Sequence, residues 1–251
     1  MSAFDDYAGA FEHVSMRRED GILELTLHSE GKSLVWGSGP HTELGHCFAR
    51  VGCDPENKVI ILTGAGENFI AELDRSWVRE MTPELWAEIH AHGRRLLMNL
   101  LEVEVPMIAA VNGPATVHAE LALLCDIVMA AEEASFKDAP HFRFGTVPGD
   151  GVHLIWPLLL GMNRGRHFLL TGKRFSADEA LELGLVAEVL PREQLLERAW
   201  AQARDLASRP AITLRYTRLA ITQLLKQALQ DNLSHGLALE GLGAWNQWPS
   251  E

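Results

Sequence analysis

Cysteine is scarce in this chain, and its thiols follow no recognisable pattern. Cys47, Cys53 and Cys125 are the full set among 251 residues. An odd number of widely spaced cysteines predicts neither a disulfide framework nor a zinc site. The N-terminus carries Asp5 and Asp6 and no basic stretch followed by an apolar one, so no secretory signal is expected. We therefore predict reduced thiols and a cytoplasmic protein.

Basic residues and long apolar runs are also in short supply. The chain has 22 lysines and arginines against 34 aspartates and glutamates, a formal net charge of −12. A negative field of this size repels phosphate groups, which argues against nucleic acid or an anionic membrane as a partner. The longest apolar run, residues 121–131, is interrupted by Asp126 and falls short of the ~20 residues that a membrane span needs.

Motifs for metals, nucleotides and nucleophilic serines are missing. The eleven histidines include no His-Glu-x-x-His pair, and His90 and His92 lie two positions apart, on different sides of a predicted helix. Neither Gly-x-Ser-x-Gly, Gly-x-Gly-x-x-Gly nor a phosphate-binding loop occurs. We expect no metal and no other cofactor.

The sequence does contain an alternation of strand and helix signals, followed by helices. Apolar runs bounded by turns predict strands at 22–28, 58–63, 107–111 and 126–131. Helical periodicity and capping signals predict helices at 42–51, 82–101, 118–124, 151–160, 176–184, from 191 onward and at 210–229. This order predicts an α/β fold with a parallel sheet and a helical C-terminal region. Ligands of such sheets gather at the carboxyl ends of strands, here the loops 64–74 and 112–118.

Five side chains are candidates for chemistry, and each has an ordinary structural alternative. His141 and Asp150 flank a turn rich in glycine and proline, where His141 could be a plain loop residue and Asp150 a helix N-cap. His118 is either a site residue or a polar group near a helix start. Trp36 either contacts a ligand or packs in the core, and Glu240 is either a site carboxylate or part of a solvated helix face. Residue chemistry alone leaves these alternatives open.

Longer motifs give nearly the whole chain, residues 7–245, a specific resemblance. They are KVIILTG at 58–64, FIAELD at 69–74, VPMIAAVNG at 105–113, CDIVMA at 125–130, GTVPG at 145–149 and LTG at 170–172. With them the chain resembles the crotonase superfamily, the enoyl-CoA hydratase/isomerase family. The resemblance implies a crotonase-like spiral of ββα units over residues 1–190 and a C-terminal helical trimerisation region over 191–251. It also implies a homotrimer or a dimer of trimers, and an oxyanion hole made of two backbone N–H groups.

The sequence departs from ordinary hydratases in three places. Glu72 stands where these enzymes have a glycine, and PATVHAE at 114–120 replaces a glycine-rich run. Glu120 matches one of the two glutamates with which hydratases add water, whereas His141 falls at the position of the second. In these respects the chain is similar to the β-diketone hydrolase branch, of the 6-oxocamphor hydrolase type. GKSLVW at 31–36 and NRGR at 163–166 add to that similarity.

That branch implies a hydrolase that cleaves the carbon–carbon bond between the two carbonyls of a cyclic or bicyclic β-diketone. Such a retro-Claisen reaction gives a keto acid and needs no cofactor. The matching motifs place the active site on Trp36, His118, His141, Asp150 and Glu240. From the match we expect His141 to act as general base with Glu240 orienting it, and Asp150 to position water or handle a proton.

The remaining roles concern binding. His118 and the Trp36 indole would donate hydrogen bonds to the substrate oxygens, helped by a backbone N–H near Leu73. The candidates for an apolar lining are Ile70, Trp77, Phe142, Phe144 and Leu154.

Two other interpretations stay open. A CoA-thioester hydratase or isomerase would use Glu120 with Asp150 as its partner. A crotonase-like scaffold would have no activity at all. Retention of all five polar or aromatic side chains argues against the scaffold, and the sequence offers no convincing cationic cluster for the phosphates of a CoA ester.

Overall fold

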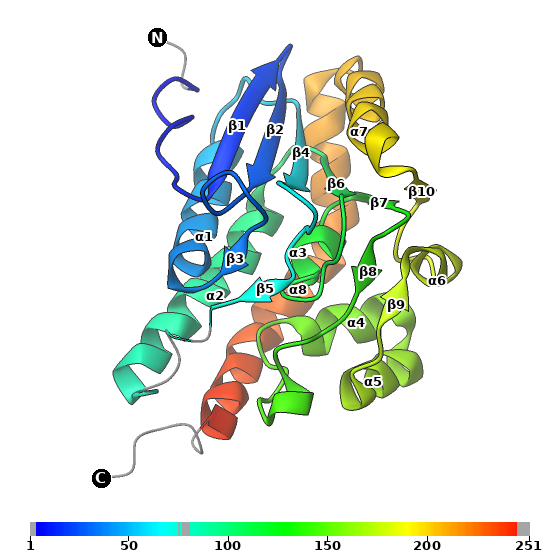
Figure 1. The fold of residues 1–251 in the computed structure, drawn as a ribbon. Coiled ribbons are helices and arrows are strands. Elements are labelled where there is room, and N and C mark those ends of the chain that lie inside the picture. The colour runs from blue at the N-terminus through cyan, green and yellow to red at the C-terminus, as the bar shows by residue number, and fades with distance from the viewer. Residues whose placement is uncertain (1–3, 75, 77–80, 245–251) are drawn as a thin grey trace.

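The structure, a computed structural model, describes residues 4–74, 76 and 81–244. Its main sheet has six strands in the order β1-β2-β4-β6-β7-β10 (Figure 1). These are β1 (Val14–Glu19), β2 (Ile22–Leu27), β4 (Val59–Gly64), β6 (Met107–Val111), β7 (Ile127–Ala131) and β10 (Glu188–Leu190). β1 and β2 pair antiparallel, and the other strands of this sheet pair in parallel. β4 and β6 are buried along nearly their whole length, as continuous apolar strands covered on both faces should be.

A second row of short strands follows the main sheet. β3 (Val35–Trp36) pairs with β5 (Glu72–Leu73), and β8 (Ser135–Phe136) pairs with β9 (Phe175–Ser176). Single bridges from Ala115 to Ile70 and to Phe136 connect the two pairs. The chain therefore passes repeatedly from a long strand to a short strand or bridge and then to a helix, which confirms the expected spiral of ββα units.

Eight α-helices surround these sheets in the described part of the chain (Figure 1). They are α1 (Ser38–Gly52), α2 (Pro83–Glu102), α3 (Glu120–Leu123), α4 (Val152–Leu160), α5 (Met162–Thr171), α6 (Ala177–Glu182), α7 (Arg192–Ala207) and α8 (Ala211–Gly243). Alternate residues of each strand point to opposite faces of the main sheet, so two separate cores form. α7 covers one face, where Trp200 packs with Ile61 and Ile108. α1 and α2 cover the other face. None of the described helices is both long and apolar enough to cross a membrane.

A buried ion pair fixes the start of α8 to the sheet. The Arg218 Nε donates to Asp126 Oδ2 at 2.7 Å, and its Nη1 donates to the carbonyls of Leu101 and Val103. The same Asp126 oxygen accepts the backbone N–H of Met107 at 2.7 Å. A buried charge with several partners is expensive to disrupt, because removal of one partner leaves the other uncompensated. The Asp126 that interrupts the apolar run thus joins β6, β7 and α8.

The sequence predictions for the long elements are confirmed, with corrections at several ends. The four predicted strands are β2, β4, β6 and β7, although β7 begins at Ile127, one residue after Asp126. The helix predicted at 118–124 is shorter, because His118 adopts the left-handed conformation with φ of 47° and α3 begins only at Glu120. The helix predicted at 210–229 continues to Gly243. β1, β10, α5 and the two-residue strands were not predicted.

Candidate active site

A cavity of about 120 Å³ lies where the loops after β4 and β6 meet α2 and α8. Its polar wall contains three histidines and two carboxylates, and its apolar wall comes from α2, α8 and the loops and short strands around them. The lining residues are Trp36, His41, Leu73, Met81, Trp86, Ile89, Val117, His118, Pro140, His141, Thr146, Asp150, Leu237, Glu240 and Ala244. Both loops that the sequence marked as ligand-binding, 64–74 and 112–118, contribute to it. The volume is on the scale of a cavity of about 150 Å³ that admits benzene, so a single small ring system fits.

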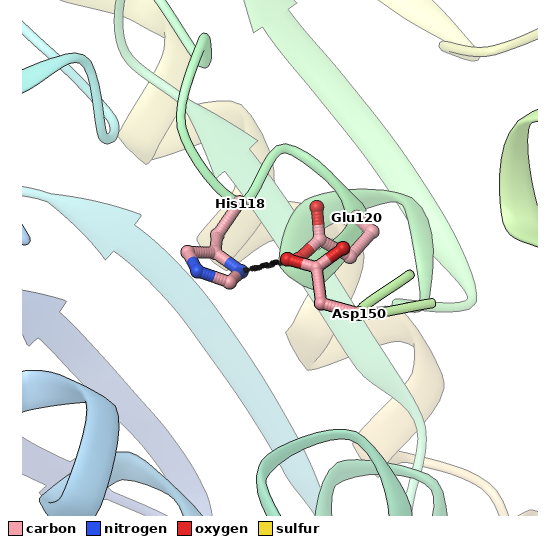
Figure 2. Close-up of side chains that lie close together, drawn as sticks. All are labelled: His118, Glu120 and Asp150. Atoms are coloured by element: carbon pink, nitrogen blue, oxygen red, sulfur yellow. Dashed lines mark hydrogen bonds and ion pairs between the residues drawn. The ribbon is translucent and has the colours of Figure 1, made fainter. Parts of the chain in front are cut away.

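His118 lies beside two carboxylates (Figure 2). Its Nδ1 is 2.5 Å from Oε1 of Glu120 and 3.6 Å from Oδ2 of Asp150. Its ring also packs against Trp36 of β3, with ring centroids 4.0 Å apart. A left-handed conformation at a residue other than glycine is uncommon, though histidine tolerates it better than most, and such residues cluster at functional sites.

His141 is held between carboxylates on both sides of its ring. Nδ1 is 2.5 Å from Oδ1 of Asp138. Nε2 is 3.4 Å from Oδ2 of Asp150 and 3.6 Å from Oε1 of Glu240. The expected orienting role of Glu240 does not match this geometry. Asp138 occupies the Nδ1 side of the ring, and Glu240 faces the same nitrogen as Asp150. Sequence reasoning missed Asp138. The spacing Asp138-x-x-His141 was the available signal, but it falls in irregular chain.

Two glycines bring Glu240 to this cluster. Gly149 lies so close to Gly236 of α8 that a Cβ on either residue would collide with the other's backbone. Glu240 follows Gly236 by about one helical turn, and Asp150 follows Gly149 directly. The close approach thus sets both carboxylates opposite His141. Glu240 is 8% exposed, so the alternative of a solvated helix face is wrong.

His118, His141 and Asp150 are stabilised in their charged forms. Burial works against protonation of His118, but Glu120, helped by Asp150, outweighs it and raises the pKa. Burial is likewise outweighed at His141, where Asp150 and Asp138 raise the pKa well above 6.5. Burial tends to raise the pKa of Asp150, but the imidazoles of His141 and His118 outweigh it and lower the pKa. Opposite charges at short distance dominate all three groups.

Other groups in and around the cavity are held closer to neutrality. Burial raises the pKa of Glu240 to about 7 despite the contact with His141, and the charge of Asp150 adds to the effect. Burial, together with the nearby His118, lowers the pKa of His41 to about 4. The Nε2–H of His41 donates to the carbonyl of Ile89 at 3.0 Å. His41 is a cavity residue that sequence reasoning missed as a site residue, because α1 carries it and its approach depends on how that helix packs.

The structure brings together most of the predicted site residues. Trp36, Leu73, His118, His141, Asp150 and Glu240 all line the cavity. Asp150 is not a helix cap, because Gly151 is the N-cap of α4. Phe144 is 55% exposed and lies outside the cavity wall.

The apolar lining differs from the one expected. Ile70, Phe142 and Leu154 are also outside the wall, and Trp77 lies outside the described residues. The apolar surface comes instead from side chains such as Trp86, Ile89 and Leu237.

Two sets of side chains have the composition of a metal site. The potential ligand atoms of His118, Glu120 and Asp150 lie within 4.8 Å of one another, as do those of His141, Asp150 and Glu240. In both sets these atoms already pair an imidazole with a carboxylate. Each carboxylate of these sets thus lies within ion-pair distance of an imidazole.

The spiral of ββα units, together with a cavity between its loops and a long C-terminal helix, defines the crotonase fold. The sequence profile of the enoyl-CoA hydratase/isomerase family matches residues 17–241, and the chain belongs to that family. Known members are similar along nearly its whole length. The 1,2-epoxyphenylacetyl-CoA isomerase of Escherichia coli is 31% identical over 228 residues, which are 88% of this chain and 86% of that protein. The short-chain-enoyl-CoA hydratase of Clostridium acetobutylicum is 29% identical over 230 residues, 91% of this chain and 86% of that protein.

Solved structures show the same fold. The structure of a β-diketone hydrolase from the cyanobacterium Anabaena, bound to (S)-3-oxocyclohexyl acetic acid, is 44% identical with a TM-score of 0.93, and the match covers 98% of both chains. An enoyl-CoA hydratase/isomerase from Mycobacterium paratuberculosis is 29% identical with a TM-score of 0.86, covering 92% of this chain and 93% of that one.

Proposed function

We propose that this protein hydrolyses the carbon–carbon bond between the two carbonyls of a cyclic or bicyclic β-diketone, giving a keto acid. The observation that carries the proposal is the convergence of two histidines and two carboxylates, His118, His141, Asp150 and Glu240, on one small cavity beside Trp36. The 44% identity to a β-diketone hydrolase supports it. The ligand of that relative contains a ketone and a carboxylic acid, the two groups that such a cleavage releases.

The walls of the cavity favour a small uncharged substrate. Among the described residues, no lysine or arginine lines it. A neutral dione needs no cationic partner in the cavity, and its ring can pack on Trp86, Ile89 and Leu237. A CoA thioester would carry phosphates toward a protein of net charge −12, which is electrostatically unfavourable.

Water attack is the first step. Nε2 of neutral His141 removes a proton from water, and the water oxygen forms a bond to one carbonyl carbon. Asp138 holds the opposite nitrogen, and together with Asp150 it stabilises the imidazolium that results. The carbonyl oxygen becomes an alkoxide, which His118 and the Trp36 indole N–H stabilise. One well-placed donor of this kind is typically worth about 10²–10³ in rate.

Carbon–carbon cleavage is the second step. The alkoxide reforms a carbonyl, the bond to the central carbon breaks, and its electron pair becomes the enolate of the second ketone. The imidazolium of His141 passes its proton to Glu240, since Nε2 and Oε1 are 3.6 Å apart. Glu240, whose pKa is about 7, then passes the proton to the enolate carbon. Water and dione are thereby converted to a keto acid with no other reactant.

The geometry also weighs against the two-carboxylate CoA-thioester hydratase. That mechanism needs Glu120 and Asp150 to reach the substrate together. Glu120 is 1% exposed, pairs with His118 and lies outside the cavity wall. The described residues therefore present Asp150 to a ligand, but not Glu120.

Ultraviolet absorbance tests the proposal directly. The purified protein is incubated with a panel of cyclic and bicyclic 1,3-diketones and, separately, with crotonyl-CoA. We expect loss of diketone absorbance with formation of a keto acid, and no water addition to crotonyl-CoA. Turnover of crotonyl-CoA with inert diketones would overturn the proposal in favour of the hydratase, and inertness toward both would favour the scaffold.

A further inference from the structure

Glu120 is a buried carboxylate for which the proposed reaction has no direct use. It is the first residue of α3, and it is 1% exposed. Oε1 is 2.5 Å from Nδ1 of His118, and Oε2 has no hydrogen-bond partner. Figure 2 shows the imidazole of His118 directed at the Glu120 carboxylate, with the Asp150 carboxylate beside it. Burial raises the pKa of Glu120, and the imidazole of His118 opposes that shift by supplying a compensating charge.

The backbone is built to make this contact. His118 and Glu120 are two positions apart, a spacing that does not bring side chains together on a regular helix. The left-handed conformation of His118, φ 47°, turns the chain immediately before α3. Hydrogen bonds on both sides hold this turn, since the Val117 N–H donates to the Ile70 carbonyl and the Leu121 N–H to the His118 carbonyl. An uncommon backbone conformation is maintained where it folds an imidazole onto a carboxylate.

We propose that Glu120 is a positioning residue for His118. Its carboxylate accepts the Nδ1–H, holds the ring against Trp36 and leaves Nε2 as the atom presented to a substrate oxygen. This inference deepens the proposed function and rests on it for the role of His118. It assigns to Glu120 no proton transfer to or from the substrate, although the residue stands at the position of a hydratase glutamate.

The charges around His118 make Glu120 the dominant partner. The titratable groups that face His118 are Glu120 of α3, Asp150 before α4, His141, His41 of α1 and Glu240 of α8. Burial and His141 disfavour the imidazolium, whereas Glu120 and, more weakly, Asp150 favour it. His118 kept cationic by Glu120 is a hydrogen-bond donor at Nε2, which suits a developing oxyanion.

Histidine NMR on the whole protein tests this assignment. In wild-type protein we expect a low-field Nδ1–H resonance that disappears in His118→Gln. Glu120→Gln removes the negative charge and should lower the pKa of His118 by about 1–3 units. With a hydrolysed diketone, kcat should fall by about 10–100-fold, the size of loss seen when the outer partner of a metal-bound histidine is removed, and KM should change less. Glu120→Asp keeps the charge and should restore most of both readouts.

The chain offers a matched control in Glu43→Gln. Glu43 also pairs with a histidine, His13, at 3.2 Å, but neither residue lines the cavity. This variant should leave kcat and the pKa of His118 unchanged. Loss of turnover in Glu120→Gln with an unaltered His118 pKa would instead make Glu120 a direct acid or base. Unchanged turnover would also overturn the proposal.

The outcome does not depend on the diketone assay alone. If no diketone is hydrolysed, the proposed function fails, but the wild-type resonance and the His118 titration still show whether Glu120 holds the ring. If Glu120→Gln does not fold, absence of the low-field Nδ1–H signal from wild-type protein would by itself overturn the positioning role.

Discussion

His141 is the residue on which the electrostatics of the site converge. Asp138 contacts one nitrogen, and Asp150 and Glu240 face the other. Asp150 and Asp138 stabilise the charged form of this buried imidazole, and they also limit how easily the ring can give up its proton. The role of His141 as a base therefore depends on pH in a direction that the structure sets.

Removal of the imidazole tests the base directly. His141→Ala should reduce kcat on a diketone by at least ~10²-fold, because general base catalysis of water attack is lost. Circular dichroism should show that the fold survives. His46→Ala, at an exposed histidine of α1, is the control and should retain full turnover. Near-normal turnover in His141→Ala would contradict the mechanism.

Asp138 should set both the orientation and the basicity of His141. The base acts in its neutral form, so kcat/KM should rise with pH through the elevated pKa of His141. Asp138→Asn removes one negative charge, which lowers that pKa and moves the rising limb to lower pH. It should also reduce the plateau by about 10–100-fold, because the amide fixes the ring less well. A pH–rate profile from pH 5 to about 10 measures both effects. A limb that stays in place would show that His141 is not the titrating base.

The candidate residues could be identified from the sequence only through the family motifs. Taken singly, His118 and Asp150 had ordinary alternatives, and nothing in their spacing favoured a site. Asp138 and His41 were missed for a physical reason. Their contacts arise from an irregular loop and from the packing of α1, and no periodic rule connects such positions in sequence.

At the scale of elements, strands buried on both faces were the easiest to predict. β4 and β6 are short apolar runs ending at turns, and such runs carry their own signal. β3 and β5 have two residues each and exist because neighbouring segments align them, so no local pattern could reveal them. The full length of α8 could not be predicted either. Gly236, Gly241 and Gly243 favour an earlier end of the helix, but packing against the core keeps it helical to Gly243.

The contact between the 145–151 loop and α8 is the element-scale feature on which the site depends. Gly149→Ala should push α8 outward, because its Cβ would collide with the Gly236 backbone. We expect a loss of about 1–3 kcal/mol in the free energy of unfolding, typical of overpacking, and a fall in kcat as Glu240 withdraws from His141. Thermal unfolding and diketone turnover measure the two effects. Gly9→Ala, with no atom within 4 Å of the new Cβ, should change neither. Unchanged stability in Gly149→Ala would show that the loop adjusts freely.

At the scale of the whole molecule, the surface of α8 bears on assembly. Part of this helix packs on α2 and α4, and Glu240 near its end completes the cavity. Elsewhere it carries large apolar side chains in solvent, with Ile212 60%, Tyr216 63%, Ile221 64% and Leu224 81% exposed. Exposed apolar patches of this kind mark interaction surfaces. They support the proposal that the 191–251 region mediates a homotrimer or a dimer of trimers.

Light scattering coupled to gel filtration tests this assembly. The wild-type protein should have three or six times the monomer mass of 27.8 kDa. Ile221→Glu combined with Leu224→Glu should lower that mass, because burial of two carboxylates in an apolar interface costs several kcal/mol. Gln223→Glu adds a charge at an exposed position between them and should change the mass least. A wild-type mass of 27.8 kDa, or a double variant that keeps the full assembly, would show that α8 does not form the interface. Glu240 lies near the end of α8. Loss of assembly should therefore weaken diketone turnover only if it also displaces that end of the helix.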